Sequence, residues 1–377
     1  MTLSRPLRRV ALLITPCFAA AAAACDVIQF VSDPRPTFEE TWSIPTSNAS
    51  ISVGSLLPNN VSIFSTPGSN PPDSSAFILS INSTTFSRRV GQDCAPCVTL
   101  NGNTTTKPAF VLAAGGASPL PTDVVSAPLA AATVNYSITN NLSFDPIRVR
   151  PTSDPNQGFM VILVRSGSVV LGRDSLNGAT DSFASGSTIT RPIVMNSGTV
   201  VGTLQVDLTI NSPAGDPAQP GVLINSNGSI ATTVAYSAVR MNNVRINVVN
   251  KTIANEPVTL DLQGLEESIT RRVVAGRLEM TIDNPWPIAG DLGLDFVYNP
   301  PASVPKTVPV PSSSATPGPQ LRDISFDKTE MQSLLGNKVV LNMSGPVSAP
   351  TPVTVSPKQA LKISNRMVLT LRTGSGQ

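Results

Sequence analysis

The sequence predicts an all-β protein that contains two or more antiparallel β-sandwich domains. Apolar and polar residues alternate with a period of two in most segments, the pattern of half-buried strands. Charged residues make up 13% of the chain, about half the usual share, and Ser, Thr, Asn, Pro and Gly fill most polar positions, as expected for short strands joined by many turns. With 377 residues, the chain is long enough for more than one hydrophobic core.

The clearest strands show three alternating apolar residues in a row. They are predicted around 134–138, 206–210, 244–248 and 278–282. A tight hairpin is also predicted, because Arg165-Ser166-Gly167 separates two apolar runs and has the composition of a short turn.

One short helix is predicted near 327–335. Asp327 stands three residues before Glu330 in a capping-box arrangement, and Gly336 follows as a stop. Between them, Met331, Leu334 and Leu335 recur at helical spacing, so one face of this helix should pack on a sheet.

The first 24 residues have the features of a signal peptide. Arg5, Arg8 and Arg9 precede the apolar run Val10–Ala24, and this order of a basic and an apolar region is typical of export signals. The run has about 15 residues, whereas a membrane-spanning helix needs roughly 20.

The residues before Cys25, Ala22-Ala23-Ala24, resemble the lipobox of bacterial lipoproteins. In that family the cysteine thiol is acylated and becomes the first residue of the mature chain. The resemblance therefore implies a lipid anchor at Cys25 in the bacterial cell envelope, at the periplasmic face or in the outer membrane. Ordinary signal-peptide cleavage is the alternative, because the family prefers Leu where this chain has Ala22.

The composition and the positions of the prolines predict the following domain organisation. Residues 300–319 carry seven prolines, which favours an extended spacer over a central strand. The expected units are a signal peptide (1–24), a tether (25–37), a β domain with a CxxC disulfide (38–125), a β-sandwich region (126–300), a Pro-rich linker (301–319) and C-terminal strands that pack back on the preceding domain (320–377).

A repeat of about 72 residues is predicted within the sandwich region. Strand ends at 136–138, 208–210 and 280–282 are equally spaced, and each runs into a turn that contains an asparagine, at Asn140, Asn211 or Asn284. Equal spacing of this kind suggests tandem β modules.

The stretch 278–296, with Asn284-Pro285-Trp286-Pro287 between two alternating strands, resembles the late-embryogenesis-abundant type 2 domain. That family has a β-sandwich in which a strand enters an Asn-Pro turn and returns as a second strand. The resemblance covers about 20 residues and implies a structural or interface role without catalysis.

Cys94 and Cys97 are the only cysteines after Cys25. In an exported protein they are expected to form a local disulfide. A redox pair is the first alternative, but such a pair opens a helix, and here Asn101-Gly102 indicates a turn soon afterwards. A metal site is the second, but it needs two further ligands.

The chain contains no histidine, which removes the Ser-His-Asp and Cys-His nucleophile systems and most zinc hydrolase signatures. Phosphate-binding and nucleophile-elbow motifs are also absent. We therefore expect no catalytic residues, cofactor or metal. The net charge of +2, less the three arginines of the signal peptide, leaves −1, so nucleic acid is not expected as a partner.

Weaker patterns have plainer explanations. Ser325 and Lys328 match a Ser-x-x-Lys spacing, which chance explains better. Glu266-Glu267 and the cluster of Asp283, Asp291 and Asp295 offer paired carboxylates, but a solvated face and turn residues explain them better. The loop around Asp174 and Asp181 has oxygen ligands suited to calcium but lacks a regular ligand order, so a turn is favoured. Arg148, Arg150 and Arg245 alternate with apolar residues and are expected on solvent faces of strands.

The function expected from the sequence is that of a non-enzymatic, lipid-anchored cell-envelope protein that acts in binding or scaffolding, with an unidentified protein or envelope partner. Two alternatives remain at this point. The first is a carrier of lipid or another apolar ligand in a cavity, and the second is a surface adhesin or assembly module.

Overall fold

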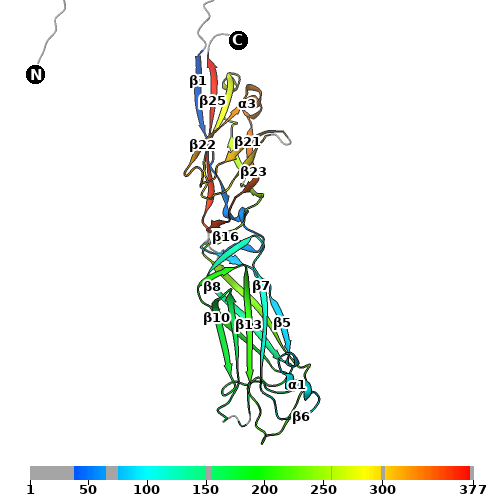
Figure 1. The fold of residues 1–377 in the computed structure, drawn as a ribbon. Helices are drawn as coiled ribbons and strands as arrows, with labels where there is room; N and C mark the ends of the chain where they lie inside the picture. The colour runs from blue at the N-terminus through cyan, green and yellow to red at the C-terminus, as the bar shows by residue number, and fades with distance from the viewer. Residues whose placement is uncertain are drawn as a thin grey trace, which may run out of the picture.

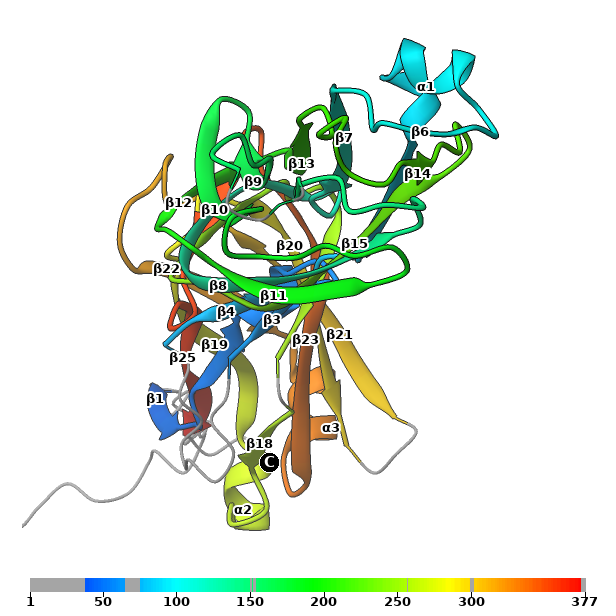
Figure 2. The ribbon, with the colours of Figure 1, turned by 90° about the horizontal axis from the view of Figure 1, so that it is seen from below.

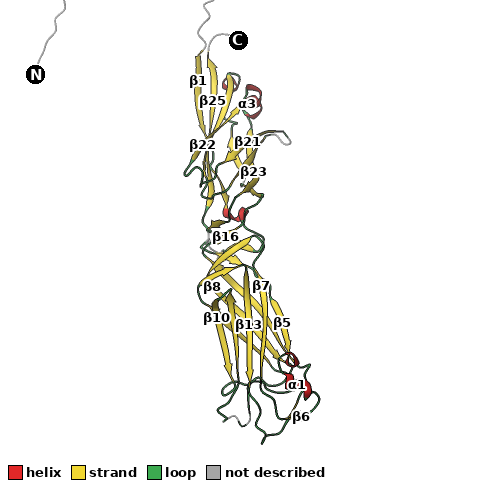
Figure 3. Cartoon of the chain, in the orientation of Figure 1, coloured by secondary structure: helices red, strands yellow, loops and turns green. Residues whose placement is uncertain are grey.

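The computed structural model describes residues 38–64, 75–149, 151, 154–255, 257–298 and 302–373. Antiparallel strands dominate these residues, as predicted (Figure 3). The helices found there are short: α1 (Ala95–Thr99), α2 (Glu267–Thr270) and α3 (Lys328–Leu334), with 3-10 turns η1 (Val53–Leu56) and η2 (Val90–Gln92). Among the described residues, no helix combines the length and the apolar character needed to cross a membrane.

One half of the molecule is a sandwich of two sheets, which we call the distal roll. Its first sheet is formed by β5 (Thr84–Arg89), β15 (Ser229–Met241), β8 (Val124–Asn140) and β11 (Thr188–Met195), in that spatial order, with β12 (Gly198–Val201) also paired to β8. Its second sheet has the order β7 (Phe110–Pro119), β13 (Thr203–Ser212), β9 (Phe159–Ser166) and β10 (Val169–Asn177). Seen along the long axis, the two sheets form separate layers (Figure 2).

The other half, which we call the proximal roll, has two sheets of the same kind. The first has the order β1 (Phe38–Pro45), β25 (Ala360–Thr373), β19 (Val273–Asp283) and β22 (Gln320–Phe326), and β2 (Ala49–Ser52) continues β1 along β25. In the second, β17 (Lys251–Ala254) and β18 (Val258–Asp261) follow one another along β23 (Lys338–Ser348), which pairs with β20 (Ala289–Val297) and then β21 (Ser303–Val310).

The two rolls share one topology. When the eight main strand positions of each roll are numbered along the chain, its sheets have the orders 1-8-3-6 and 2-7-4-5. This is the arrangement of a jelly roll, in which two Greek keys form a double sheet. The all-β sandwich prediction is therefore confirmed, and the protein contains two jelly rolls of equivalent connectivity.

The distal roll is inserted in the proximal one. The proximal roll takes its first strands, β1 and β2, from the start of the described chain and its other strands from residues after 250, and the distal roll lies between them in sequence. The two ends of the described chain therefore meet, since Phe38 pairs with Thr373. They lie at one end of an elongated molecule, and the distal roll occupies the other (Figure 1).

Backbone pairing and an ion pair join the rolls. β24 (Val353–Val355), from the proximal part of the chain, pairs with β16 (Val244–Ile246), which in turn pairs with β8 of the distal roll. Short strands β3 (Val61–Ile63) and β4 (Phe77–Leu79) extend the same sheet beside β15. Lys251 Nζ lies 2.7 Å from Asp123 Oδ2 across the junction. These contacts make the junction continuous with the sheets, unlike a flexible linker.

Each roll has a buried asparagine at the end of its third strand. In the distal roll, Asn140 Nδ2 donates to Phe144 O (2.9 Å) and Phe183 O (2.7 Å), and its Oδ1 accepts from Leu142 N (2.8 Å). In the proximal roll, Asn284 makes the same three bonds, to Ile288 O, Pro311 O and Trp286 N. We call each set of three bonds an asparagine lock, because it fixes the turn after the strand to a second loop.

The locks correct the predicted repeat. Asn140 and Asn284 are 144 residues apart in sequence and occupy equivalent positions, whereas 208–210 lies in β13, the seventh strand of the distal roll. The repeating unit is therefore a whole jelly roll. The spacing of 72 residues arises because two different strands of the distal roll have similar sequences.

Several predicted domain boundaries are also wrong. β1 and β2 belong with β25, so 38–125 is not one domain, and 126–300 spans parts of both rolls. The Pro-rich stretch is not a linker, because β21 pairs with β20 along its whole length. Pro305 and Pro309 are tolerated because β21 is an edge strand and needs no N–H donor on its outer side. Of the strands after residue 320, β22 and β25 pair with β19, β23 pairs with β20, and β24 pairs with β16.

The predicted helix is present as α3. Asp327 Oδ1 accepts from Glu330 N and Glu330 Oε2 accepts from Asp327 N, which completes the capping box. Met331 and Leu334 are buried on its inner face. Gly276 of β19 faces Met331 without a Cβ, so the helix packs close to the sheet.

Candidate functional site

The long connections of the distal roll gather at the end of the molecule farthest from the termini, which we call the distal tip (Figure 1). They are the described residues of the segments 90–109, 141–158, 178–187 and 213–228. The connection between β9 and β10 is only Gly167-Ser168, with Gly167 at φ +59. Long loops on a rigid β scaffold are the usual place for binding residues.

Lys107 holds the loop that follows β8. Its side chain is almost fully buried, and Nζ donates to the carbonyl oxygens of Asp145 (3.3 Å), Pro146 (3.1 Å) and Arg148 (3.3 Å). Burial lowers the pKa of the Lys107 ammonium to about 8, and the charge of Asp145 opposes that change. The ammonium also lies 5.9 Å from the centre of the Phe144 ring.

Asp145 ties the same loop to its neighbour. Its Oδ1 accepts from the backbone N–H groups of Ile147 and Arg148, and its Oδ2 accepts from Ser182 Oγ and Phe183 N. The loop after β8 and the loop after β10 are therefore fixed to each other before any ligand arrives. A fixed loop loses less conformational entropy on binding.

These loops enclose a hollow of about 520 Å³ at the distal tip. Lys107, Asp145, Arg148 and Asp216 all line it, so its charged groups include two of each sign. Lys107 and Asp145 are already hydrogen-bonded within the protein, and Arg148 donates to the carbonyl oxygens of Gly178 and Asp181.

The remaining polar groups of the hollow suit an uncharged ligand. Asp216 Oδ1 accepts from Ala218 N, and the neighbouring Gln219 and Ser143 add amide and hydroxyl groups to the lining. Such a set can hydrogen-bond hydroxyl and amide groups of a ligand, while the balance of charges offers no preference for an anion or a cation.

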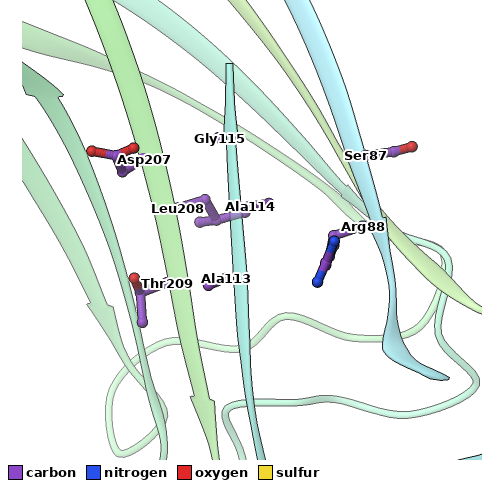
Figure 4. Close-up of a pocket in the computed structure, with 8 residues that line it drawn as sticks. All are labelled: Ser87, Arg88, Ala113, Ala114, Gly115, Asp207, Leu208 and Thr209. Carbon is purple, nitrogen blue, oxygen red and sulfur yellow. The ribbon is translucent and has the colours of Figure 1, made fainter. Parts of the chain in front are cut away.

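A second hollow, a groove of about 470 Å³, runs beside β7 on the flank of the distal roll (Figure 4). Ala113, Ala114 and Gly115 of β7 form its floor. Asp207 and Thr209 of β13 lie on one side of β7, and Arg88 of β5 lies on the other side. Arg88 is held by Asp93, with Nε–Oδ2 and Nη2–Oδ1 distances of 2.9 and 2.7 Å.

Of the residues predicted to carry a site, Cys25 lies outside the described residues. Cys94 and Cys97 form a disulfide. The expectation that the pair does not open a helix is wrong, because Cys94 caps α1 and its Sγ accepts from Cys97 N. Both cysteines are fully buried, which fits a structural bond at the base of the distal tip, since disulfide exchange needs an accessible sulfur.

The oxygen-rich loop considered for calcium is satisfied within the protein. Asp181 Oδ2 accepts from Asn177 N and Thr180 Oγ1, and its Oδ1 lies 2.9 Å from Arg191 Nη2. The Arg191 guanidinium supplies the positive charge beside Asp181 that a bound metal ion would otherwise supply. In the described part of the chain, no three Cys, Asp or Glu side chains are placed to hold a metal ion.

The other candidate groups are not brought together. Ser325 is exposed on β22, and Lys328 is exposed at the start of α3. Neither hollow is lined by Glu266, Glu267 or the aspartates of β20. Arg245 is exposed on β16, as expected, but Arg148 belongs to the loop after β8 and not to a strand.

The sequence analysis missed Lys107, Asp145 and Asp216. They belong to no motif, and a lysine is rarely buried, so nothing in the local sequence marks Lys107 as an interior residue. The Gly, Pro and Asn residues at 213–228 indicate a long loop and are a sequence signal for the region around Asp216 alone.

No family model matches the chain, and no curated protein matches it. Among solved structures, a candidate secreted protein from Parabacteroides distasonis is 11% identical, with a TM-score of 0.30, over 89% of this chain and 100% of that one. PNGase F, a glycosylasparaginase from Flavobacterium meningosepticum, is 10% identical, with a TM-score of 0.17, over 78% and 100% of the two chains.

A tandem CBM22 domain of Xyn10C from Paenibacillus barcinonensis is 8% identical, with a TM-score of 0.17, over 77% of this chain and 98% of that one. At TM-scores this low, the similarities carry no argument about this chain.

Proposed function

We propose that this chain is a non-enzymatic binding protein of the bacterial cell envelope, anchored by a lipid at Cys25. The proximal roll acts as a spacer, and the distal roll presents the ligand-binding surface. The ligand at the distal tip is a molecule rich in hydroxyl or amide groups and without a strong net charge.

The position of the two ends carries this proposal. β1 begins at Phe38, so only the segment 26–37 separates Cys25 from the folded part of the chain. β1 enters the proximal roll at one end of the molecule, and the hollow lies at the opposite end (Figure 1). A lipid at Cys25 would therefore hold the proximal roll near the membrane and direct the distal tip away from it.

The composition of the hollow favours binding over transport of an apolar molecule. A lipid carrier needs an apolar cavity, whereas four charged side chains line this hollow. The interiors of the rolls are filled by large side chains, among them Tyr136 and Phe183 in the distal roll and Trp286 and Phe296 in the proximal roll.

Removal of the thiol tests the anchor. Wild-type and Cys25→Ser proteins are produced in a bacterium that processes lipoproteins, and membranes are washed with high salt before immunodetection. The proposal expects the wild-type protein in the washed membranes, with Cys25 acylated at its N-terminus by mass spectrometry, and the variant in the soluble fraction. A Cys25→Ser protein that stays with the washed membranes would contradict the anchor.

A further inference from the structure

β1 presents two aromatic side chains to solvent at the end of the molecule where the described chain begins and ends (Figure 1). Phe38 is 61% exposed and Trp42 is 43% exposed. Both lie on the inner face of the sheet, because Phe38, Glu40 and Trp42 alternate along β1 and Trp42 is paired with the buried Leu369 of β25. Aromatic residues on an inner face are normally covered, so their exposure marks a contact surface.

The distal roll has a strand in the same position, and there it is covered. β4 pairs with the C-terminal part of β15, the last strand of the distal roll, just as β1 pairs with the C-terminal part of β25. Phe77 and Leu79 of β4 are 0% and 2% exposed, at the junction of the two rolls beside β3. The junction therefore closes this end of the distal roll, whereas the corresponding end of the proximal roll leaves Phe38 and Trp42 exposed.

The charged groups around β1 have both signs. Glu40 is exposed between the two aromatic residues, and Glu39, on the opposite face, pairs with Arg372 of β25. Arg372 N donates to the carbonyl oxygen of Arg272, whose side chain is also exposed. Guanidinium groups hydrogen-bond to phosphates, and a carboxylate hydrogen-bonds to ammonium groups. These residues therefore suit a surface that carries phosphate and ammonium groups side by side, as phosphatidylethanolamine does.

The chain before β1 limits the distance between this end and a lipid at Cys25. Residues 26–37 separate Cys25 from Phe38, and a fully extended chain of that length spans about 40 Å at most. A short tether keeps the effective concentration of the lipid surface high, so a contact that is weak between separate molecules becomes populated.

We propose that the face of β1 formed by Phe38, Glu40 and Trp42 lies against the lipid surface, with both aromatic rings in the headgroup region. Aromatic side chains of the tryptophan type favour this region, because the ring is apolar and its N–H can still reach water. The inference rests on the proposed lipid anchor. It adds a direct contact that orients the proximal roll on the membrane and directs the distal tip away from it.

The two tryptophans make this contact measurable. Trp42 is exposed and Trp286 is fully buried, so a lipid contact should change the emission of Trp42 alone. The chain from Cys25 onward keeps every described residue, and Cys25 is its one thiol while the Cys94–Cys97 disulfide is intact. Coupling this thiol to a maleimide lipid, in vesicles of phosphatidylethanolamine and phosphatidylglycerol, supplies the anchor chemically.

On these vesicles the emission of Trp42 should shift to shorter wavelength and be quenched by nitroxide-labelled lipid. The same chain with Cys25 capped by N-ethylmaleimide should show neither change, because the contact is weak without the tether. In Trp42→Phe, the remaining emission of Trp286 should not respond to the vesicles.

Substitutions on the two faces of β1 test which face makes the contact. Phe38→Ser should lower the ratio of bound to free β1, followed by quenching of Trp42, roughly tenfold, because it removes one buried aromatic ring. Thr41→Ser is the matched control, since Thr41 is exposed on the opposite face of the same strand, and it should leave the quenching unchanged.

Two results would overturn the inference. The first is the same Trp42 emission and quenching in the tethered and the capped chains. The second is a shift of Trp42 emission that needs no vesicles and grows with protein concentration, with a dimer in sedimentation, which would assign the face to a second copy. An unacylated Cys25 in cells would refute the anchor without changing the vesicle result, so the two proposals fail in different experiments.

Discussion

Replacement of Asn140 or Asn284 by alanine should destabilise the roll that contains it by about 3 kcal/mol. Each side chain is buried, at 0% and 5% exposure, and makes three hydrogen bonds to backbone groups of two loops. Each bond contributes about 1 kcal/mol to stability, and the backbone groups left without partners add a further cost. Because the two locks are equivalent, the two losses should be similar.

The positions of the tryptophans allow each roll to be followed separately. The chain has two tryptophans, Trp42 in β1 and Trp286 in the turn after β19, and both belong to the proximal roll. Urea unfolding followed by tryptophan fluorescence therefore reports the proximal roll, whereas far-UV circular dichroism reports both rolls. Asn284→Ala should lower the midpoint of the fluorescence transition, and Asn140→Ala should lower the midpoint of the component seen only by circular dichroism.

Asn141→Ala is the control, because Asn141 is exposed beside Asn140 and should change stability by less than about 0.5 kcal/mol. A loss below 1 kcal/mol in either lock variant, or a large loss in only one of them, would refute the equivalence of the two turns.

Two further predictions concern the base of the distal tip. The pKa of Lys107 is about 8 in the folded protein and about 10.4 in an unfolded chain, so between these values the unfolded state holds more protons. The free energy of unfolding, measured in urea from pH 7 to 10, should therefore rise with pH by up to about 3 kcal/mol. The rise should disappear in Lys107→Met, and an unchanged rise in that variant would show that another group causes it. Reduction of the Cys94–Cys97 bond, or replacement of both cysteines by serine, should lower the free energy of unfolding of the distal roll, followed by circular dichroism, by about 2 kcal/mol. The tryptophan fluorescence transition should stay unchanged, and a shift of that transition would place the effect outside the distal roll.

Much of the local structure followed from the sequence. Alternation at 134–138, 206–210 and 278–282 identified strands because a half-buried sheet needs one apolar face. Asp327 and Glu330 identified the start of α3, because a capping box is a local set of bonds. These signals depend on neighbours within a few residues, which one sequence shows directly.

The pairing of distant segments did not follow. Alternation tells which face of a strand is buried, but not which strand lies beside it. β1 pairs with β25 more than 300 residues away, and the composition of 38–45 gives no indication of it. Pro305 and Pro309 were attributed to a linker because the sequence does not show that β21 is an edge strand, where proline is allowed.

The hollow at the distal tip was the least predictable feature because loops from four parts of the chain form it. Lys107 reaches the loop after β8, about 40 residues away, and meets backbone oxygens there that any residue type could provide. Such contacts leave no local motif.

Hydrogen–deuterium exchange of the chain from Cys25 onward, with and without bacterial cell-envelope material, tests the proposed binding role most directly. The account predicts that added envelope protects the distal roll, at the loops that contain Lys107, Asp145 and Asp216, and leaves the exchange of the proximal roll unchanged. Protection confined to the proximal roll would contradict it, because the ligand surface would then lie on the part that we assign as a spacer.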